Sequence, residues 1–407
     1  MVIFAHHFCD YPVVNITTLF VILIVLALWL LALAVQMGCL LFLFIRPAFH
    51  PISPLAPPPA PVAGVTIVVC AHNEHDNLLE LLPLLTAQAY PLYEVLVMDD
   101  RSTDFTHVLL DELVTLLPNL RQIRIDVEAK HVTPKKYALT IALKKATYPV
   151  VLLTDADCRP ASNQWLAGMV GQLRSHETEI VLGVSPYERR PGLLNFLIRS
   201  ETLFTAVQYL SLALAGWPYM GVGRNLLYRR DVFFRHKGFY SHMRIWGGDD
   251  DLFVNEAATR RNVTVSLHPD TFTTSAPKTT WADWKRQKQR HLSVGKRYKT
   301  GDTMRLGLII ASHVLTWLLG LIVGGYVAYL ALTGQRAALL SPLVLGSTAL
   351  FVLRFGLFWG IIGRLSRRLG DQICWYAIPA TDLLLAIYYC LSTLRVAFTW
   401  RRKQVGW

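Results

Sequence analysis

The sequence predicts an α/β protein with a mostly parallel, doubly wound sheet and with transmembrane helices on both sides of that domain in the chain. Only 17% of the 407 residues are charged, whereas soluble domains carry about 25%. Residues 11–45 contain no Asp, Glu, Lys or Arg. From Val65 onward, short β-rich runs alternate with segments of helical periodicity, which indicates parallel strands covered by helices.

Four regions follow from these patterns. Residues 1–45 are expected to hold an N-terminal transmembrane helix, and residues 46–64 form a proline-rich linker, which is a stiff, extended spacer. Residues 65–305 are expected to form a cytoplasmic α/β domain with helices at the membrane interface. Residues 306–407 are expected to form a membrane region of about three helices.

The apolar stretches set the membrane prediction, because about 20 apolar residues suffice to span a bilayer. After residues 11–45, the candidates are Leu306–Gln335, Ala337–Gly363 and Ile373–Val396. The last two contain Arg354 and Asp382. Ionisable groups at membrane depth are costly, so these two pair with each other or line a cavity; alternatively, Arg354 lies at the interface.

The charge distribution favours a membrane over nucleic acid as partner. The net charge is +12, and a basic run from Lys285 to Arg305 directly precedes an apolar stretch, as on a cytoplasmic flank. Asp10 before the first span and Arg46 after it place the N-terminus outside. A fully spanning fourth stretch would put Arg401 outside, against this rule, so that stretch is re-entrant or interfacial, or the tail is an exception.

The middle region gives a definite order of elements. Strands are expected at Val65–Cys70, Glu94–Met98, Arg121–Ile125 and Val150–Thr154, and helices at Asp76–Gln88, from an Asp104 N-cap to Leu117, and at Pro134–Thr147. The apolar stretch Pro191–Gly216 is interpreted as a core helix or an interfacial helix. A span there would separate Asp157 from Asp249 by the membrane.

Polar residues follow the expected strands, where ligands bind in such sheets. These ends carry Ala71–Glu74, Asp99–Ser102 and Asp155–Asp157. Carboxylates at Asp155 and Asp157 suit Mg²⁺ or Mn²⁺ and, through the metal, substrate phosphates; a helix cap beside a surface acid is the alternative. A third acidic cluster, Asp249–Asp251, follows two glycines. Glycine-rich dinucleotide and P-loop motifs are absent from the sequence, which argues against those sites.

Together these motifs resemble the membrane-bound family 2 glycosyltransferases of the GT-A fold, such as polysaccharide synthases and ceramide glucosyltransferases. The resemblance covers about Val65 to Tyr298. The matching segments, in order, are Cys70–Glu74, Asp99–Asp104 (Arg101 replacing Gly), Lys135–Leu139, Asp155–Asp157, Gly223–Arg230, Gly248–Leu252 and Gln287–His291 (His replacing Trp).

The resemblance implies a role for each candidate residue. Asp249 is the expected general base, with Asp250 as the alternative because the family's Glu is missing; its pKa would suit that task best if raised. Asp157, with Asp155, would hold Mg²⁺ or Mn²⁺. The other expected substrate-binding residues are Asn73, Glu74, Asp99, Asp100, Lys135, Gln287, Arg290 and His291. Among them, Arg290 and Lys135 would contact phosphates, and Asp100 and Asn73 the nucleobase and ribose.

The expected function is inverting transfer of a sugar from a nucleotide-diphosphate sugar to a lipid or glycan acceptor. Its expected location is the cytoplasmic face of a bacterial inner membrane. One alternative is a processive polysaccharide synthase coupled to export; another is a non-catalytic scaffold or transporter. His291 stacks on a sugar less well than Trp and can hydrogen-bond instead, which favours addition of one or a few sugars to a lipid.

Overall fold

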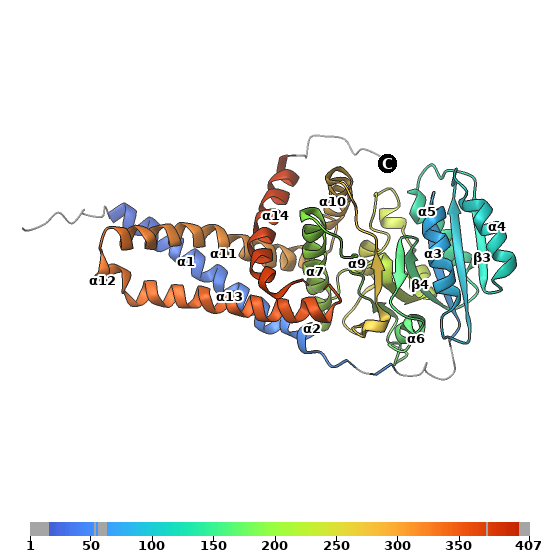
Figure 1. Cartoon of the computed structure of the whole chain (residues 1–407), viewed down its shortest axis with the longest axis horizontal. Helices are drawn as coiled ribbons and strands as arrows, with labels where there is room; N and C mark the ends of the chain where they lie inside the picture. The colour runs from blue at the N-terminus through green and yellow to red at the C-terminus, as the bar shows by residue number, and fades with distance from the viewer. Residues whose placement is uncertain (1–15, 53, 56–62, 372, 399–407) are drawn as a thin grey trace, which may run out of the picture.

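The central α/β domain is built on a seven-stranded sheet in the order β3-β2-β1-β4-β7-β6-β8. The computed structural model describes residues 16–52, 54–55, 63–371 and 373–398 (Figure 1). The strands of the large sheet are β1 (Val65–Ala71), β2 (Tyr93–Asp100), β3 (Leu120–Ile125), β4 (Val150–Asp155), β6 (Ile180–Leu182), β7 (Leu226–Arg229) and β8 (Val263–Val265). β1 to β4 pair in parallel, whereas β7 is antiparallel to both β4 and β6. The prediction of a mostly parallel sheet is confirmed.

Helices cover both faces of this sheet, as expected for a doubly wound fold. One face packs against α3 (His75–Thr86), α4 (Thr106–Leu116) and α6 (Trp165–Val170), and the other against α5 (Pro134–Lys145), α7 (Leu193–Leu214) and α9 (Asp251–Ala257). In β1, Val65, Ile67 and Val69 face the first core while Val68 faces the second. A strand buried on both faces needs an unbroken apolar run, which is what β1 has.

Shorter elements complete the domain. They are β5 (Cys158–Pro160), α8 (Arg230–Arg235) and β9 (Thr273–Ser275), with 3₁₀ turns η2 (Gly223–Asn225), η3 (Tyr240–His242) and η4 (Pro269–Thr271). β5 and β9 form a separate two-stranded sheet. Strand boundaries differ from the predicted ones by one or two residues: β1 ends one residue later at Ala71, and β2 and β4 continue into the acidic residues that follow their apolar runs.

Two predicted helix details can be compared with the structure. The N-cap position before α4 belongs to Phe105, although the Asp104 carboxylate does accept a hydrogen bond from the Thr106 amide at 3.0 Å. Asp104 therefore caps the helix from one residue further back than predicted. The apolar stretch Pro191–Gly216 forms α7, most of whose residues are buried in the domain core, so the core interpretation holds.

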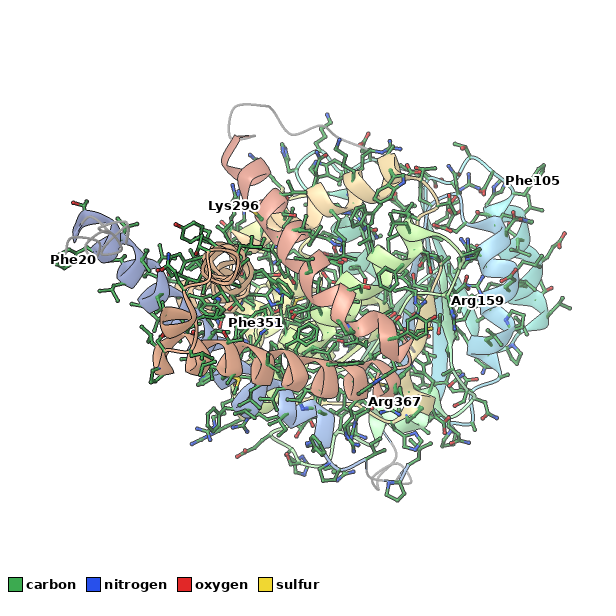
Figure 2. All side chains as sticks on the ribbon, turned by 60° about the vertical axis from the view of Figure 1, so that its left-hand side comes forward. Phe20, Phe105, Arg159, Lys296, Phe351 and Arg367 are labelled. Atoms are coloured by element: carbon green, nitrogen blue, oxygen red, sulfur yellow. The ribbon has the colours of Figure 1, made fainter. Side chains whose placement is uncertain are left out.

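Among the residues that the structure describes, three helices are long and apolar enough to cross a membrane. The first is a continuous rod of α1 (Ile16–Gly38), the π-helical turn η1 (Cys39–Phe44) and α2 (Ile45–Phe49); the others are α11 (Thr300–Leu332) and α13 (Pro342–Arg368), joined by α12 (Arg336–Leu339). Figure 1 shows them projecting together from the α/β domain. In Figure 2, Phe20 lies near the far end of α1 and Arg367 lies beside the domain.

The fourth predicted stretch forms the 3₁₀ turn η5 (Trp375–Ala377) and α14 (Ile378–Phe398), which is not among the three candidate spans. In Figure 1 it stands across the direction of the bundle, beside α7 and α10 (Trp281–Gly295). The rings of Tyr388 on α14 and Trp284 on α10 lie 6.0 Å apart. This placement favours the re-entrant or interfacial alternative. Asp10 and Arg401, on which the topology argument also relied, lie outside the described residues.

The bundle interior contains a sealed polar cluster, which we call the bundle cluster: Gln36, His313, Arg354 and Asp382. Arg354 and Asp382 are 0% exposed, and the guanidinium binds both carboxylate oxygens. Gln36 and His313 each accept a further hydrogen bond from Arg354 Nη2, at 3.1 and 3.3 Å. The predicted pairing is therefore present, and the interfacial alternative for Arg354 is wrong.

Candidate active site

The register of the parallel strands brings three acidic loops to one edge of the sheet. Cys70 at the end of β1 pairs with Asp155 on one side, and Ala71 pairs with Asp99 on the other. The loops that follow these strands therefore start side by side, as predicted from the strand ends.

The first two loops are joined through Asn73. Its amide oxygen accepts hydrogen bonds from the backbone amides of Thr103 at 2.7 Å and Asp104 at 3.3 Å. Asn73 has a left-handed backbone, with φ of 57°, a conformation that asparagine tolerates better than most residues. The side-chain oxygen thus holds the two loops together, while the binding role expected for Asn73 stays a prediction.

Asp99 and Asp100 differ in their surroundings. Asp99 is fully buried, and its Oδ1 accepts the Ser102 amide at 3.3 Å. The Asp100 carboxylate is held by Arg101, whose Nε and Nη2 lie 2.8 and 3.3 Å from its two oxygens. Arg101 has φ of 56°, which explains why glycine suits this position in the family pattern. Arg101 thus places a guanidinium beside Asp100, the residue expected to contact the nucleobase.

Lys135 connects the end of β4, at Asp155, with a further acidic loop, Asp249–Asp251. Its ammonium lies 2.8 Å from Asp155 Oδ1 and 3.2 Å from Asp249 Oδ2. Pro134 in the first turn of α5 fixes the entry of that helix. Burial acts to lower the pKa of Lys135, but Asp155 and Asp249 outweigh it and raise the pKa, so the group is charged. The side chains remain 38%, 32% and 12% exposed for Lys135, Asp155 and Asp249.

A single lysine does not neutralise the acids around it. Burial and then Asp155 raise the pKa of Asp157. Burial also raises the pKa of Glu74, with Asp157 and Asp155 adding to the effect. Carboxylates that raise one another's pKa are stabilised by a nearby cation. Because Mg²⁺ needs only one or two protein carboxylates when phosphates and water complete its shell, Asp155 and Asp157 fit a divalent metal.

Metal binding at these acids would depend on additional oxygen ligands. Within the described part of the chain, His, Cys, Asp and Glu form no group of three or more that could hold a metal ion. Asp157 Oδ1 accepts a hydrogen bond from Ser275 on β9 at 3.3 Å, which fixes one of its two oxygens. This arrangement suits a cation that arrives together with a substrate phosphate.

The three acids of the loop Asp249–Asp251 have different partners. Asp250 is the N-cap of α9: its Oδ1 accepts the Asp251 amide at 2.8 Å, and its Oδ2 accepts the Gly223 amide at 2.6 Å. Asp251 accepts from the Leu252 amide and from the Tyr298 hydroxyl, both at 2.8 Å. Asp249 instead faces Lys135 and lines a small cavity with Asp155.

The expected rise in the pKa of Asp249 is not found. Burial alone would raise it, but Lys135 and, to a lesser extent, Lys136 outweigh burial and lower the pKa. The sequence suggested the opposite because Asp250 and Asp251 are adjacent in the chain, whereas the lysines reach Asp249 only in the folded protein. Two glycines with φ of 81° and 79°, Gly247 and Gly248, form the turn that presents Asp249.

Helix α10 carries the last motif. Gln287 Nε2 donates to the Tyr187 hydroxyl at 3.1 Å. Arg290 is exposed, and its side chain passes close to Gly247. A Cβ atom added at Gly247 would lie 3.4 Å from Arg290 Cγ. His291 keeps solvent access, but the surrounding protein and the charges of Lys288 and Arg290 hold its pKa well below the usual range. It is therefore a neutral imidazole at neutral pH.

A family model for glycosyl transferase family 2 matches residues 66–235. The matched residues run from β1 to α8 of the α/β domain. The chain is 29% identical to the glycosyltransferase AglE of Haloferax volcanii over 121 residues, covering 29% of this chain and 38% of AglE. It is 27% identical to hyaluronan synthase of Streptococcus pyogenes over 206 residues, 47% of this chain and 48% of the synthase. The chain thus spans about half or less of the length of these curated relatives.

The fold of the transferase domain also has a solved counterpart. The mannosyltransferase PcManGT of Pyrobaculum calidifontis, solved with GDP-Man and Mn²⁺, superposes with a TM-score of 0.54 and 21% identity. The match covers 86% of this chain and all of that protein. It confirms the GT-A fold predicted for residues that follow the first span.

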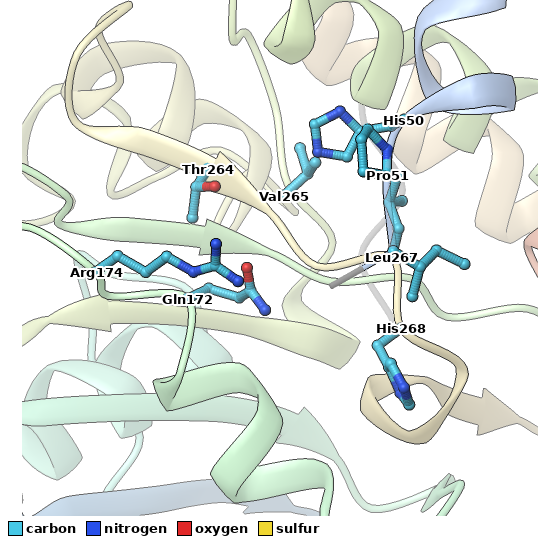
Figure 3. A pocket seen from close by; sticks show the side chains of 9 residues that line it. His50, Pro51, Gln172, Arg174, Thr264, Val265, Leu267 and His268 are labelled. Atoms are coloured by element: carbon cyan, nitrogen blue, oxygen red, sulfur yellow. The ribbon is translucent and has the colours of Figure 1, made fainter. Parts of the chain in front are cut away.

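A cavity larger than the one beside Asp155 and Asp249 lies away from these acids. Figure 3 shows it between the linker residues His50 and Pro51, the loop with Gln172 and Arg174, and the segment from Thr264 to His268. None of the predicted site residues lines it. The cavity beside Asp155 and Asp249 is smaller, so cavity size alone would not have pointed to these acids.

The sequence analysis missed two side chains near Asp155 and Asp157. Arg224 lies in the segment that matched the family between Gly223 and Arg230, and its guanidinium stacks on the Tyr187 ring with the carbon 4.3 Å from the ring centroid. Tyr187 stands outside every motif. Arg224 could have been noticed as a basic residue inside a matched motif, whereas nothing in the sequence pointed to Tyr187.

Proposed function

We propose that the protein is an inverting glycosyltransferase that moves a sugar from a nucleotide-diphosphate sugar to a lipid or glycan acceptor at the cytoplasmic membrane surface. The observation that carries this proposal is the meeting of Asp155 and Asp249 at one lysine, beside Asp157. Asp155, suited to hold a metal–diphosphate, and Asp249, suited to accept a proton, thus line one small cavity.

The donor would enter along the edge of the sheet. Asp100 and the loops joined by Asn73 lie where the nucleoside would bind, next to the Asp155–Asp157 segment. Mg²⁺ or Mn²⁺ at Asp155 and Asp157, when bound, would neutralise charge developing on the diphosphate. Lys135 and Arg290 would supply further positive charge to the phosphates.

Asp249 would accept the proton of the acceptor hydroxyl. With one base and no protein nucleophile, the acceptor oxygen attacks the anomeric carbon directly and its configuration inverts. The lowered pKa keeps Asp249 ionised and available at neutral pH. Asp250 is the weaker candidate, because both of its oxygens already accept backbone hydrogen bonds.

Membrane features support a lipid acceptor. The exposed helix α10 combines Trp281, Trp284 and several basic residues, which is typical of a membrane-surface helix. Neutral His291 on the same helix can donate or accept one hydrogen bond with an acceptor hydroxyl. A processive synthase would need a path through the membrane helices, and the bundle cluster fills the space where α1, α11, α13 and α14 meet.

The test uses the full chain purified in detergent, with Mn²⁺, a lipid extract and a panel of radiolabelled UDP- and GDP-sugars. We expect a short, organic-soluble product that is lost with excess EDTA or in Asp157→Ala, while the exposed control Asp231→Ala stays active. A water-soluble polymer of high molecular weight would favour the processive synthase. Absence of transfer from every donor would favour the scaffold or transporter.

A further inference from the structure

The guanidinium of Arg224 is a cation without a hydrogen-bond partner in the described structure. Among the described residues, the guanidinium forms no ion pair, and it stacks on the ring of Tyr187. Nη1 is buried and has no hydrogen-bond partner within the described ranges. A buried donor left unpaired costs free energy, and more so when it is charged. The site is therefore incomplete without an acceptor for this group.

The backbone around Arg224 is held by both halves of the site. On one side, the Gly223 amide donates to Asp250 at 2.6 Å. Asp250 belongs to the loop Asp249–Asp251, which we call the base loop. On the other, Thr273 of β9 donates to the Arg224 carbonyl at 3.1 Å, and Ser275 of the same strand donates to Asp157. The turn η2 is thus fixed between the base loop and the candidate metal acids.

The ring beneath the guanidinium is fixed as well. The Tyr187 hydroxyl accepts a hydrogen bond from Gln287 of α10 at 3.1 Å, and Tyr187 forms an isolated β-bridge with Ser275. Stacking on a held ring pre-orients the planar fork of arginine, so less entropy is lost when it binds a ligand. A lysine at this position would not be oriented in the same way.

Electrostatics place Arg224 next to the candidate metal acids without pairing it to them. Burial acts to lower its pKa, but Tyr187, Cys158, Asp157 and Asp155 together raise it. Among the described residues no carboxylate lies within 4.0 Å of the guanidinium. Two other cations in the region are occupied: Lys135 by two acids, and Lys136 by the carbonyls of His242 and Ile245.

We propose, on the basis of the proposed transferase function, that Arg224 binds a phosphate oxygen of the reactants. Arginine recognises phosphate through paired N–H donors. The nearness of Asp155 and Asp157 favours the diphosphate of the donor over a phosphate group on the acceptor lipid. In that position Arg224 offsets the charge that develops on the departing diphosphate.

The experiment measures ligand binding rather than turnover. Isothermal titration of the full chain in detergent with Mn²⁺ uses inorganic pyrophosphate, UDP, GDP and farnesyl monophosphate as separate probes. Arg224→Met should weaken binding of pyrophosphate and of the preferred nucleoside diphosphate by at least about tenfold, or one step of about 1.4 kcal/mol. Arg224→Lys should restore part of the affinity, and the exposed control Arg174→Met should match the wild type.

The outcomes separate this inference from the function on which it rests. Binding of uridine and guanosine should be the same in all variants, since they lack phosphate. A loss confined to farnesyl monophosphate would assign Arg224 to the acceptor phosphate. Wild-type affinity of Arg224→Met for every probe that the wild type binds would overturn the proposal. If the wild type binds none of them, the transferase function itself fails, and this inference with it.

Discussion

Two groups of charged side chains in this protein are arranged in opposite ways. The bundle cluster pairs Arg354 with Asp382 through two hydrogen bonds, excludes solvent, and uses Gln36 and His313 to complete the shell. The second group, which we call the strand-end cluster, sets several carboxylates against one lysine and stays partly exposed. Its members are Glu74, Lys135, Asp155, Asp157 and Asp249.

The difference shows what each cluster can do. Arg354 Nε lacks a hydrogen-bond partner among the described residues, but the sealed pair is neutral overall and fixes the packing of the helices that contribute to it. An open cluster with excess negative charge is unstable until a cation joins it, so it is suited to binding. Both could be called buried salt bridges, yet only the unbalanced one is a candidate active site.

The largest expected effect comes from breaking the sealed pair. Asp382→Ala leaves Arg354 as an uncompensated buried charge, which costs about 3–5 kcal/mol of folding stability. The double variant Arg354→Met/Asp382→Leu removes both charges and should recover most of this loss. Thermal unfolding in detergent measures both. Equal stability of Asp382→Ala and the wild type would mean that the pair does not hold the bundle together.

The next effect concerns the base in the strand-end cluster. Asp249→Asn removes basicity while keeping the shape of the side chain, so turnover should fall by ~10²-fold or more with donor binding and unfolding temperature retained. Asp250→Asn, in contrast, should weaken the cap of α9 and lower the unfolding temperature. If Asp250→Asn is inactive but fully stable while Asp249→Asn is active, the base is Asp250.

A smaller effect should appear in the pH profile. Lys135 is the main group that lowers the pKa of Asp249 against burial. In Lys135→Met the pKa of Asp249 rises, so the acidic limb of the kcat/KM profile should move to higher pH. Asp250, Lys136 and Asp155 also face this region and keep their charges in the variant. An unmoved acidic limb would show that Lys135 does not control the ionisation of the base.

The last prediction concerns the pH dependence of stability and the neighbouring acid Asp251. Burial and then Asp250 raise its pKa from 3.8 to about 8. The folded protein therefore holds a proton that the unfolded chain has released, and this stabilisation is present below pH 3.8 and lost as the pH rises through about 8. Asp251→Asn should flatten the fall in unfolding temperature up to pH 8.5 or so. The exposed control Asp231→Asn should retain the wild-type slope.

Local sequence patterns predicted the fold and many of the residues in the bundle cluster and the strand-end cluster. Unbroken apolar runs such as Val65–Cys70 predict strands buried on both faces, and the pairing of Arg354 with Asp382 follows from the cost of charge in a membrane. The strand ends also indicated Asp155 and Asp157, and the acidic cluster after two glycines indicated Asp249. What these patterns lack is the distance between side chains from remote segments.

That distance decides the remaining features. Lys135 reaches Asp249 only because α5 and the base loop meet above the sheet edge, and this contact reverses the pKa direction expected from Asp250 and Asp251. The orientation of α14 depends on its packing against α7 and α10, which the hydropathy of its own residues does not contain. Arg224 acquires its significance from Tyr187, a residue outside every motif.

Helix α11 links the membrane to the base loop by a rigid element. It has 33 residues, which at ~1.5 Å per residue makes it about 50 Å long. The hydrocarbon core is only about 30 Å thick, so the polar first turns of α11 extend above it. There Asp302 accepts a hydrogen bond from Asn255 of α9 at 3.0 Å. For an α11 that spans the bilayer, the length of this one helix would set the height of the base loop above the lipid headgroups, and bilayer thickness would act on the candidate active site.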